Sequence, residues 1–263
     1  DRLVEMVERA HAAGANLIKV QKRDVASFYT PEQLQSYYWS PFGTTLGAYR
    51  QGVELDDRLL RLLDETCRKA GIEWFCSVLD WAFYEVITTY HPKLIKIPST
   101  ISDHRELHSR LAADYQGPLV VSTGFTEAAY LDYILSTFSR NECIYPMHCV
   151  SAYPTSRADC NVAVVGAYGA MARQRPQIIP SYSSHDLGSL GSMLALAAGA
   201  KMVEKHVKLG DVDWVHFDKV AVDLRTTAFS EYVRDIRIAE EILGSPEKRI
   251  LASENHKYIP AKK

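Results

Sequence analysis

The sequence predicts an α/β fold, a (β/α)8 barrel of the TIM type in which the first β-strand is missing from this chain. Three observations lead there. Short apolar runs of strand length alternate with helical stretches along the chain. Most runs are nearly continuous in apolar residues, as strands covered on both faces of a parallel sheet are. The chain has seven such runs but eight helical stretches, because one helix precedes the first run. A closed barrel would need a strand before that helix. A doubly wound sheet is the alternative.

The predicted strands follow one another at regular intervals, at residues 16–22, 72–78, 94–99, 118–124, 143–153, 177–185 and 202–209. Helices are expected between them, at residues 1–15, 57–70, 81–90, 103–113, 128–138, 161–173, 187–199 and 229–243. The helix over 57–70 shows the pattern well, since Leu59, Leu60, Leu63 and Cys67 fall on one face. Glycines follow several helices, as helix ends favour.

The chain of 263 residues fits one domain, which we place at residues 1–250, followed by a polar tail at 251–263. One connection, residues 23–56, is far longer than the roughly two to six residues usual after a barrel strand. It is rich in aromatic rings. A lid, a contact surface and an ordered excursion on the barrel rim are the readings it allows.

Composition excludes several classes of protein. With 30 Lys+Arg against 32 Asp+Glu, the net charge of −2 does not suit binding of nucleic acid by bulk charge. No apolar run approaches the roughly 18 residues of a membrane span, and the charged amphipathic start does not read as a signal peptide. Five cysteines without a CxxC motif favour free thiols in a reducing compartment. We therefore expect a cytoplasmic protein without nucleic-acid or membrane partners.

Polar residues gather where the predicted strands end, which in a barrel is one mouth. Two lysines, Lys19 and Lys96, lie inside different apolar strands. A buried lysine is costly unless it meets an anion or a counter-charge. Together with nearby hydroxyl groups, the pair predicts binding of a phosphate or carboxylate, while a salt bridge remains the plain alternative for each lysine alone.

Two histidines, His185 and His206, end consecutive strands and are candidates for one divalent ion. A third ligand is expected from the stretch Asp211, Asp213, His216 and Asp218. A mixed nitrogen and oxygen set suits Mn²⁺, Co²⁺ or Zn²⁺. Five other histidines are expected on the surface: His11, His91, His104, His108 and His256.

Six motifs in order carry a resemblance to a known family: AGANLIKVQ (13–21), LIKIPS (94–99), LVVSTG (119–124), MHCVSAYP (147–154), SSHDLG (183–188) and GAKMVEKHV (199–207). The chain resembles the sialic acid synthases in the form that lacks a C-terminal antifreeze-like domain. Members condense phosphoenolpyruvate with an N-acylated amino sugar, such as N-acetylmannosamine or a diacetamido-trideoxyhexose, and release phosphate. The resemblance implies a homodimer and a divalent metal, Mn²⁺ first, with Mg²⁺, Co²⁺ or Zn²⁺ as alternatives.

The resemblance also implies roles for residues. It makes Lys19, Lys96 and Tyr153 catalytic and His185 and His206 metal ligands. It places six residues around the substrates: Gln21, Ser77, Ser99, Ser122, Ser151 and Ser183. The chain departs from the family at Ile101, where an acidic residue is usual, and in lacking the family's opening strand.

Three other functions compete with this reading. One is a catalytically impaired synthase-like barrel that acts as a regulatory or scaffold subunit. Another is a different phosphoenolpyruvate-dependent sugar-acid synthase. A metal-dependent hydrolase on a barrel is the third, although the early strands visible in this sequence carry none of the His and Asp ligands it would need.

Overall fold

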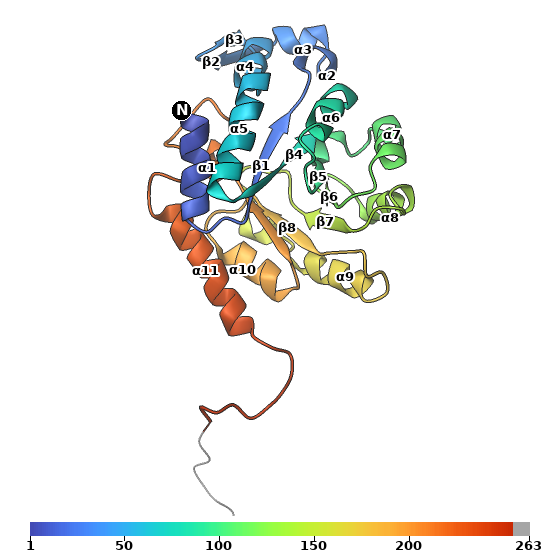
Figure 1. Cartoon of the computed structure of the whole chain (residues 1–263), viewed down its shortest axis with the longest axis vertical. Helices are drawn as coiled ribbons and strands as arrows, with labels where there is room; N and C mark the ends of the chain where they lie inside the picture. The colour runs from blue at the N-terminus through green and yellow to red at the C-terminus, as the bar shows by residue number, and fades with distance from the viewer. Residues whose placement is uncertain (255–263) are drawn as a thin grey trace, which may run out of the picture.

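Seven parallel strands form one curled sheet in the computed structural model, which describes residues 1–254 (Figure 1). The strands lie side by side in chain order: β1 (Leu17–Lys22), β4 (Glu73–Val78), β5 (Ile95–Ile97), β6 (Leu119–Ser122), β7 (Ile144–His148), β8 (Ser181–Ser184) and β9 (Met202–Lys205). Each forms within a predicted run. Within residues 1–254 the sheet ends at β1 on one side and at β9 on the other. The prediction of a parallel α/β sheet is confirmed.

Helices cover the outside of the sheet: α1 (Arg2–Ala12), α5 (Asp57–Ala70), α6 (Trp81–Thr88), α7 (Arg105–Asp114), α8 (Ala128–Thr137), α9 (Ala163–Ala172), α10 (Leu190–Ala197) and α11 (Ala228–Leu243). Local chemistry sets their ends. Asp56 caps α5 by accepting a hydrogen bond from the amide of Leu59, and Gly71 closes that helix in the left-handed region. No helix within residues 1–254 has the length and apolar character to cross a membrane.

The long connection after β1 is ordered rather than a loop. It contains α2 (Val25–Phe28), α3 (Pro31–Gln35), the antiparallel hairpin of β2 (Tyr37–Ser40) and β3 (Gly43–Thr45), and α4 (Leu46–Val53). It sits at the carboxyl end of β1 (Figure 1). A buried ion pair at 3.0 Å between Arg23 and Glu54 joins its two ends. These helices and strands are short and depend on tertiary contacts. The sequence therefore indicates only that the connection is long and rich in aromatic residues.

The strands alternate between two faces, and this decides which side chains reach the inside of the curl. An inner apolar cluster fills it, made of Phe75, Leu94, Val120 and Met147 with Leu17, Tyr145 and Met202 packed against them. Intervening residues such as Ile95 and Ile97 join the outer core under the helices. Residues two positions beyond the inner cluster, toward the carboxyl ends, therefore face the mouth.

The prediction that His108 lies on the surface is wrong. Its side chain, on α7, is fully buried among aromatic rings of α8, and neither ring nitrogen has a hydrogen-bond partner within residues 1–254. A histidine is equally compatible with either face of an amphipathic helix, so the sequence alone does not indicate that His108 is buried. Among the other four histidines predicted on the surface, His256 lies outside the described residues.

Replacing His108 with phenylalanine is expected to flatten the acid side of the stability profile. Burial, reinforced by the charge of Arg105, lowers the pKa of His108 from 6.5 to about 4. The unfolded chain therefore binds the extra proton between these pH values, and the free energy of unfolding decreases as pH falls through that window, by up to about 3 kcal/mol. Denaturation at several pH values, with the exposed His11→Phe as control, measures this. An unchanged slope in His108→Phe would contradict it.

Candidate functional site

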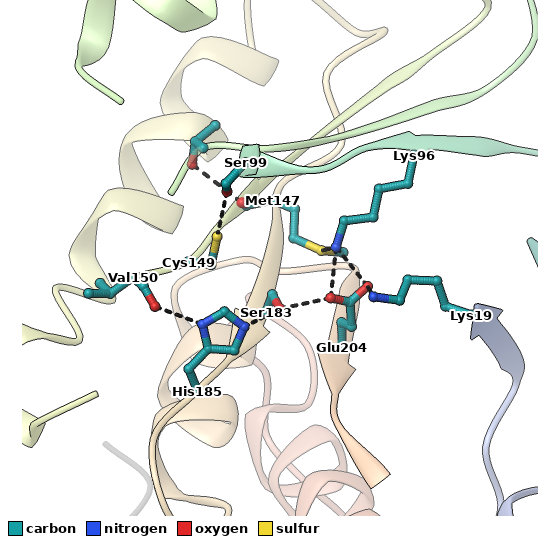
Figure 2. A network of polar contacts seen from close by, with 10 residues as sticks. Lys19, Lys96, Ser99, Met147, Cys149, Val150, Ser183, His185 and Glu204 are labelled. Carbon is teal, nitrogen blue, oxygen red and sulfur yellow. Dashed lines mark hydrogen bonds and ion pairs between the residues drawn. The ribbon is translucent and has the colours of Figure 1, made fainter. Parts of the chain in front are cut away.

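The centre of the mouth is a carboxylate held by two lysines (Figure 2). Lys96 of β5 places its Nζ 2.7 and 2.8 Å from the two carboxylate oxygens of Glu204 on β9. Lys19 of β1 reaches the same carboxylate at 3.5 Å. The two lysines predicted to meet at one mouth do meet there, and the counter-charge they share is an internal one.

Burial and charge oppose each other in this cluster. Burial by itself would raise the pKa of the Glu204 carboxyl, but the ammonium groups of Lys19 and Lys96 outweigh it and hold that pKa far below its usual range. Burial lowers the pKa of Lys96, while Glu204 acts in the opposite direction. Glu204 is therefore ionised, and two cationic groups share one negative charge. The surplus of positive charge favours a further anion in the mouth.

His185 follows β8 and is oriented by its neighbours. Its Nδ1–H donates to the carbonyl of Val150 at 2.7 Å, so Nε2 carries the free lone pair. Nε2 lies 3.4 Å from the hydroxyl of Ser183, which in turn donates to Glu204 at 2.9 Å. Figure 2 shows this chain of contacts running from His185 to the lysines.

His206 follows β9, and its ring stacks on that of His185 with centroids 5.4 Å apart. Burial first, and the charge of Lys19 second, lower the pKa of His206 to about 3. The ring of Tyr153 lies 4.4 Å from that of His185 and 6.1 Å from that of His206. The predicted imidazole pair and the tyrosine therefore form one cluster beside Glu204.

A second group of small side chains lies where β5, β6 and β7 end. The hydroxyl of Ser99 is 3.6 Å from the thiol of Cys149. A methyl group added at Gly124 would meet Ser151 Oγ at 2.6 Å, Ser99 Oγ at 2.7 Å and Cys149 Sγ at 2.8 Å. Glycine is thus required at 124 for the two hydroxyls and the thiol to come together, and the three side chains form a cradle of polar groups.

Three other residues predicted to bind the substrates have fewer contacts with the lysine and histidine cluster. Ser77 pairs in register with Lys96, and its buried hydroxyl has no hydrogen-bond partner within residues 1–254. Ser122 is buried at the end of β6. Gln21 is exposed at the end of β1, and no contact ties it to the cluster. Ser77 therefore offers a free donor beside Lys96, whereas Gln21 stands apart in the described chain.

The two histidines have the geometry of metal ligands, but a third ligand does not lie beside them among residues 1–254. A carbonyl on Nδ1 and a free Nε2 form the arrangement that metal-binding histidines use, and a neutral His206 suits the same role. Within residues 1–254, however, no three His, Cys, Asp or Glu side chains form a metal-binding group. The expected third ligand is not supplied by Asp211 or Asp218, because both pair with Lys208.

Glu204, Gly124 and Cys149 belong to the site but were not selected as site residues from the sequence. Glu204 lies in the predicted strand over residues 202–209, and the alternation of the run EKH is the signal that points to it. Glu204 and His206 face inward, whereas Lys205 faces outward and donates to Ser184 and Asp186. Gly124 gives no sequence signal beyond its place after a strand.

Replacing Gly124 with alanine is expected to block the cradle without unfolding the protein. The added methyl would displace Ser99 and Ser151, and we expect binding of a phosphate-bearing ligand to weaken at least about tenfold. Titration with phosphoenolpyruvate measures this. The matched control is Gly166→Ala on α9, where the nearest atom lies 3.8 Å away. Equal affinity in both variants would remove the cradle from the binding site.

The model of the NeuB family matches residues 6–248. The N-acetylneuraminate-9-phosphate synthase of Drosophila melanogaster is 30% identical over 209 residues, which cover 78% of this chain and 55% of that protein. The N,N'-diacetyllegionaminic acid synthase of Legionella pneumophila is 28% identical over 93% of this chain and 69% of its own length. This chain therefore spans little more than half of the first relative.

A solved structure shares the fold. The N-acetylneuraminic acid synthetase of Leptospira borgpetersenii, crystallised in complex with citrate, superimposes with a TM-score of 0.77. The match covers 95% of this chain and 82% of that chain, at 22% sequence identity. At that identity the likeness bears on the fold.

Proposed function

The chain belongs to the NeuB family, and on that basis we propose that it is a nonulosonic (sialic) acid synthase, a transferase that condenses phosphoenolpyruvate with the aldehyde of an N-acylated amino sugar and releases phosphate. The observation that carries the proposal is the meeting of Lys19, Lys96 and Glu204 beside His185 and His206 at one mouth. The names of the relatives support an acceptor of the N-acetylmannosamine or diacetamido type.

Phosphoenolpyruvate binds between the lysines and the small polar groups. Lys19 and Lys96 face its negative charges, and the hydroxyls of Ser77, Ser99, Ser122, Ser151 and Ser183 donate to its phosphate and carboxylate oxygens. Glu204 keeps both lysines in place before the ligand arrives. Because Lys96 is buried, its attraction for the leaving phosphate is little screened by water.

Carbon–carbon bond formation follows from that placement. C3 of phosphoenolpyruvate attacks the aldehyde carbon of the open-chain sugar, and the cation formed at C2 is trapped by water. The tetrahedral intermediate then loses phosphate by cleavage of its C–O bond, which leaves the 2-keto acid. Tyr153, whose ring lies tilted against that of His185, holds the sugar against the imidazole pair. A divalent cation, when bound by His185 and His206, supplies Lewis-acid polarisation of the aldehyde, with Mn²⁺ as our first choice and Mg²⁺, Co²⁺ or Zn²⁺ as alternatives.

We further propose that the curled sheet belongs to a (β/α)8 barrel completed by one more strand between β1 and β9. The ion pair of Lys19 with Glu204 supports this, because it links the two open edges of the sheet. Residues 1–250 would then form the synthase domain, acting as a homodimer in the cytoplasm. The tail prediction for 251–263 lies mostly outside the described residues.

One observation favours the alternative of an impaired barrel with a regulatory or scaffold role. Ile101, at the position where the family resemblance expects an acid, is buried in the outer core and offers no proton donor to the mouth. The two functions differ in a single assay, since a regulatory subunit binds ligand without releasing phosphate.

The experiment is a phosphate-release assay with phosphoenolpyruvate, Mn²⁺ and a panel of N-acylated amino sugars. We expect release that requires both substrates and that falls by at least about 100-fold in Lys96→Met. Exposed Lys93→Met is the matched control, since Lys93 pairs with Glu73 at the surface. Release without a sugar, or none with any sugar, would contradict the synthase proposal.

A further inference from the structure

A polar network lies on the outer face of β8 and β9, behind the two histidines of the mouth. Ser184 and Lys205 are paired in register there. Lys205 Nζ donates to the Ser184 hydroxyl at 2.9 Å and to the main-chain carbonyl of Asp186 at 2.5 Å. The Ser184 hydroxyl donates in turn to Asp186 Oδ1 at 2.7 Å. We call Ser184, Asp186 and Lys205 the outer lock.

Two helices cover the outer lock. Asp186 is buried, and Tyr182 of β8 donates a further hydrogen bond to its Oδ1 at 3.1 Å. Helix α10 passes so close that a methyl group added at Gly191 would meet Asp186 Oδ2 at 2.4 Å. From α11, the ring of Tyr232 faces the lysine of the lock, and its hydroxyl shares a hydrogen bond with Ser192 of α10 at 2.6 Å. Asp186 is thus enclosed between the sheet and both helices.

The polar character of the lock contrasts with the outer face of other strands. Ile95 and Ile97 of β5 and Val121 of β6 lie in the apolar core beneath their helices. A polar network in such a layer adds little net stability, because each buried group gives up its hydrogen bonds to water. It can instead select one arrangement of the backbone, since all its groups are satisfied only in that arrangement. The lock therefore specifies how the carboxyl ends of β8 and β9 lie against each other.

The two ends of the lock adjoin the two imidazoles in the chain. Asp186 directly follows His185, and Lys205 directly precedes His206. The hydrogen bond from His185 Nδ1 to the carbonyl of Val150 orients that ring. Its distance from the ring of His206, 5.4 Å between centroids, depends on how the two backbone segments lie. The contact of Lys205 with the Asp186 carbonyl joins these segments.

We propose that Lys205 and Asp186 are positioning residues, which fix the separation of His185 and His206 from the outer face of the sheet so that both imidazoles reach one divalent cation. The inference rests on the proposed function, because that cation is the one assigned there to the imidazole pair. Both residues act through the backbone and leave the mouth itself free. Loss of the outer partners of metal ligands typically weakens metal binding by about 10- to 100-fold.

The test measures binding of Mn²⁺ alone by calorimetry, which does not depend on turnover. Lys205→Met keeps the length of the side chain and removes both hydrogen bonds of the ammonium group. We expect the affinity for Mn²⁺ to fall at least about tenfold. The affinity for phosphoenolpyruvate should change little, because Glu204 keeps its bonds to Lys96 and Ser183 on the inner face.

Two controls separate positioning from a general loss of stability. Tyr232→Phe removes the hydroxyl shared with Ser192 in the same layer and keeps the ring beside Lys205. It should lower the free energy of unfolding without changing the affinity for Mn²⁺. Lys201→Met, at the exposed lysine before β9, should change neither quantity. Should Lys205→Met fail to fold, Ser184→Ala breaks the path from the lysine to the Asp186 carboxylate and should itself weaken Mn²⁺ binding severalfold.

The outcomes distinguish this inference from the proposed function. An unchanged affinity for Mn²⁺ in Lys205→Met, or in Ser184→Ala where the first variant does not fold, would overturn the inference and leave the synthase standing. An equal loss in Tyr232→Phe, or an equal loss of phosphoenolpyruvate binding, would also overturn it. If the unaltered protein bound no Mn²⁺, the metal role in the proposed function would fail together with the inference.

Discussion

Glu204→Gln should lower the free energy of unfolding by about 3 to 5 kcal/mol, because the change leaves two ammonium groups in the mouth without their shared counter-charge. Glutamine keeps the size and the hydrogen-bond acceptor, so packing is not the cause. Lys96 is affected most, since its side chain is almost entirely buried and both its short contacts go to this carboxylate. Denaturant titration at neutral pH measures the loss.

Inorganic phosphate should restore much of that stability. The exposed pair of Lys93 and Glu73 provides the control, and Glu73→Gln should change stability by less than about 1 kcal/mol. Phosphate stabilises whichever state binds it, so Glu204→Gln should gain more from it than the unaltered protein does. A variant as stable as the unaltered protein, or one indifferent to phosphate, would show that the lysines do not form an anion site.

The second large effect is expected at His185. His185→Ala removes a free Nε2 lone pair from the imidazole pair, and we expect metal-dependent phosphate release to fall at least about 100-fold. Binding of phosphoenolpyruvate should persist, because Lys19 and Lys96 do not touch this ring directly. Turnover at several Mn²⁺ concentrations, together with a phosphoenolpyruvate titration, separates loss of the metal from loss of the fold.

His11→Ala on α1 serves as control for that measurement, since its imidazole is exposed on the helix that precedes β1. If His185→Ala turned over at the rate of this control, the histidine pair would have no role in holding a metal.

The sheet could be predicted from the sequence because each strand is a short apolar run and each helix has local end signals, such as Asp56 and Gly71 around α5. Strand alternation also predicts the inward direction of Lys19, Lys96, Ser183 and the two histidines. These features are local, and periodicity alone carries them. The register that brings them to one mouth follows from the parallel order of the strands.

The rest depends on contacts between distant residues. Nothing local indicates that Lys96 and Glu204, 108 positions apart, share a salt bridge, or that Tyr38 reaches Trp214. The helices and strands between residues 23 and 56 are too short to be predicted from sequence periodicity. Packing between aromatic rings and the Arg23–Glu54 ion pair stabilise them. The buried position of His108 was missed for the same reason, since aromatic neighbours on another helix enclose it.

The most direct test of the account follows the bridging oxygen of phosphoenolpyruvate. Phosphoenolpyruvate is labelled with ¹⁸O at the oxygen between C2 and phosphorus and is incubated with Mn²⁺ and an N-acylated amino sugar. Mass spectrometry then shows which product carries the label. Cleavage at C–O after attack by C3 predicts that the label leaves entirely with phosphate, and that Lys96→Met suppresses the reaction. Label retained in the sugar acid, or phosphate released at the same rate without the sugar, would contradict the claim that this mouth joins the two substrates.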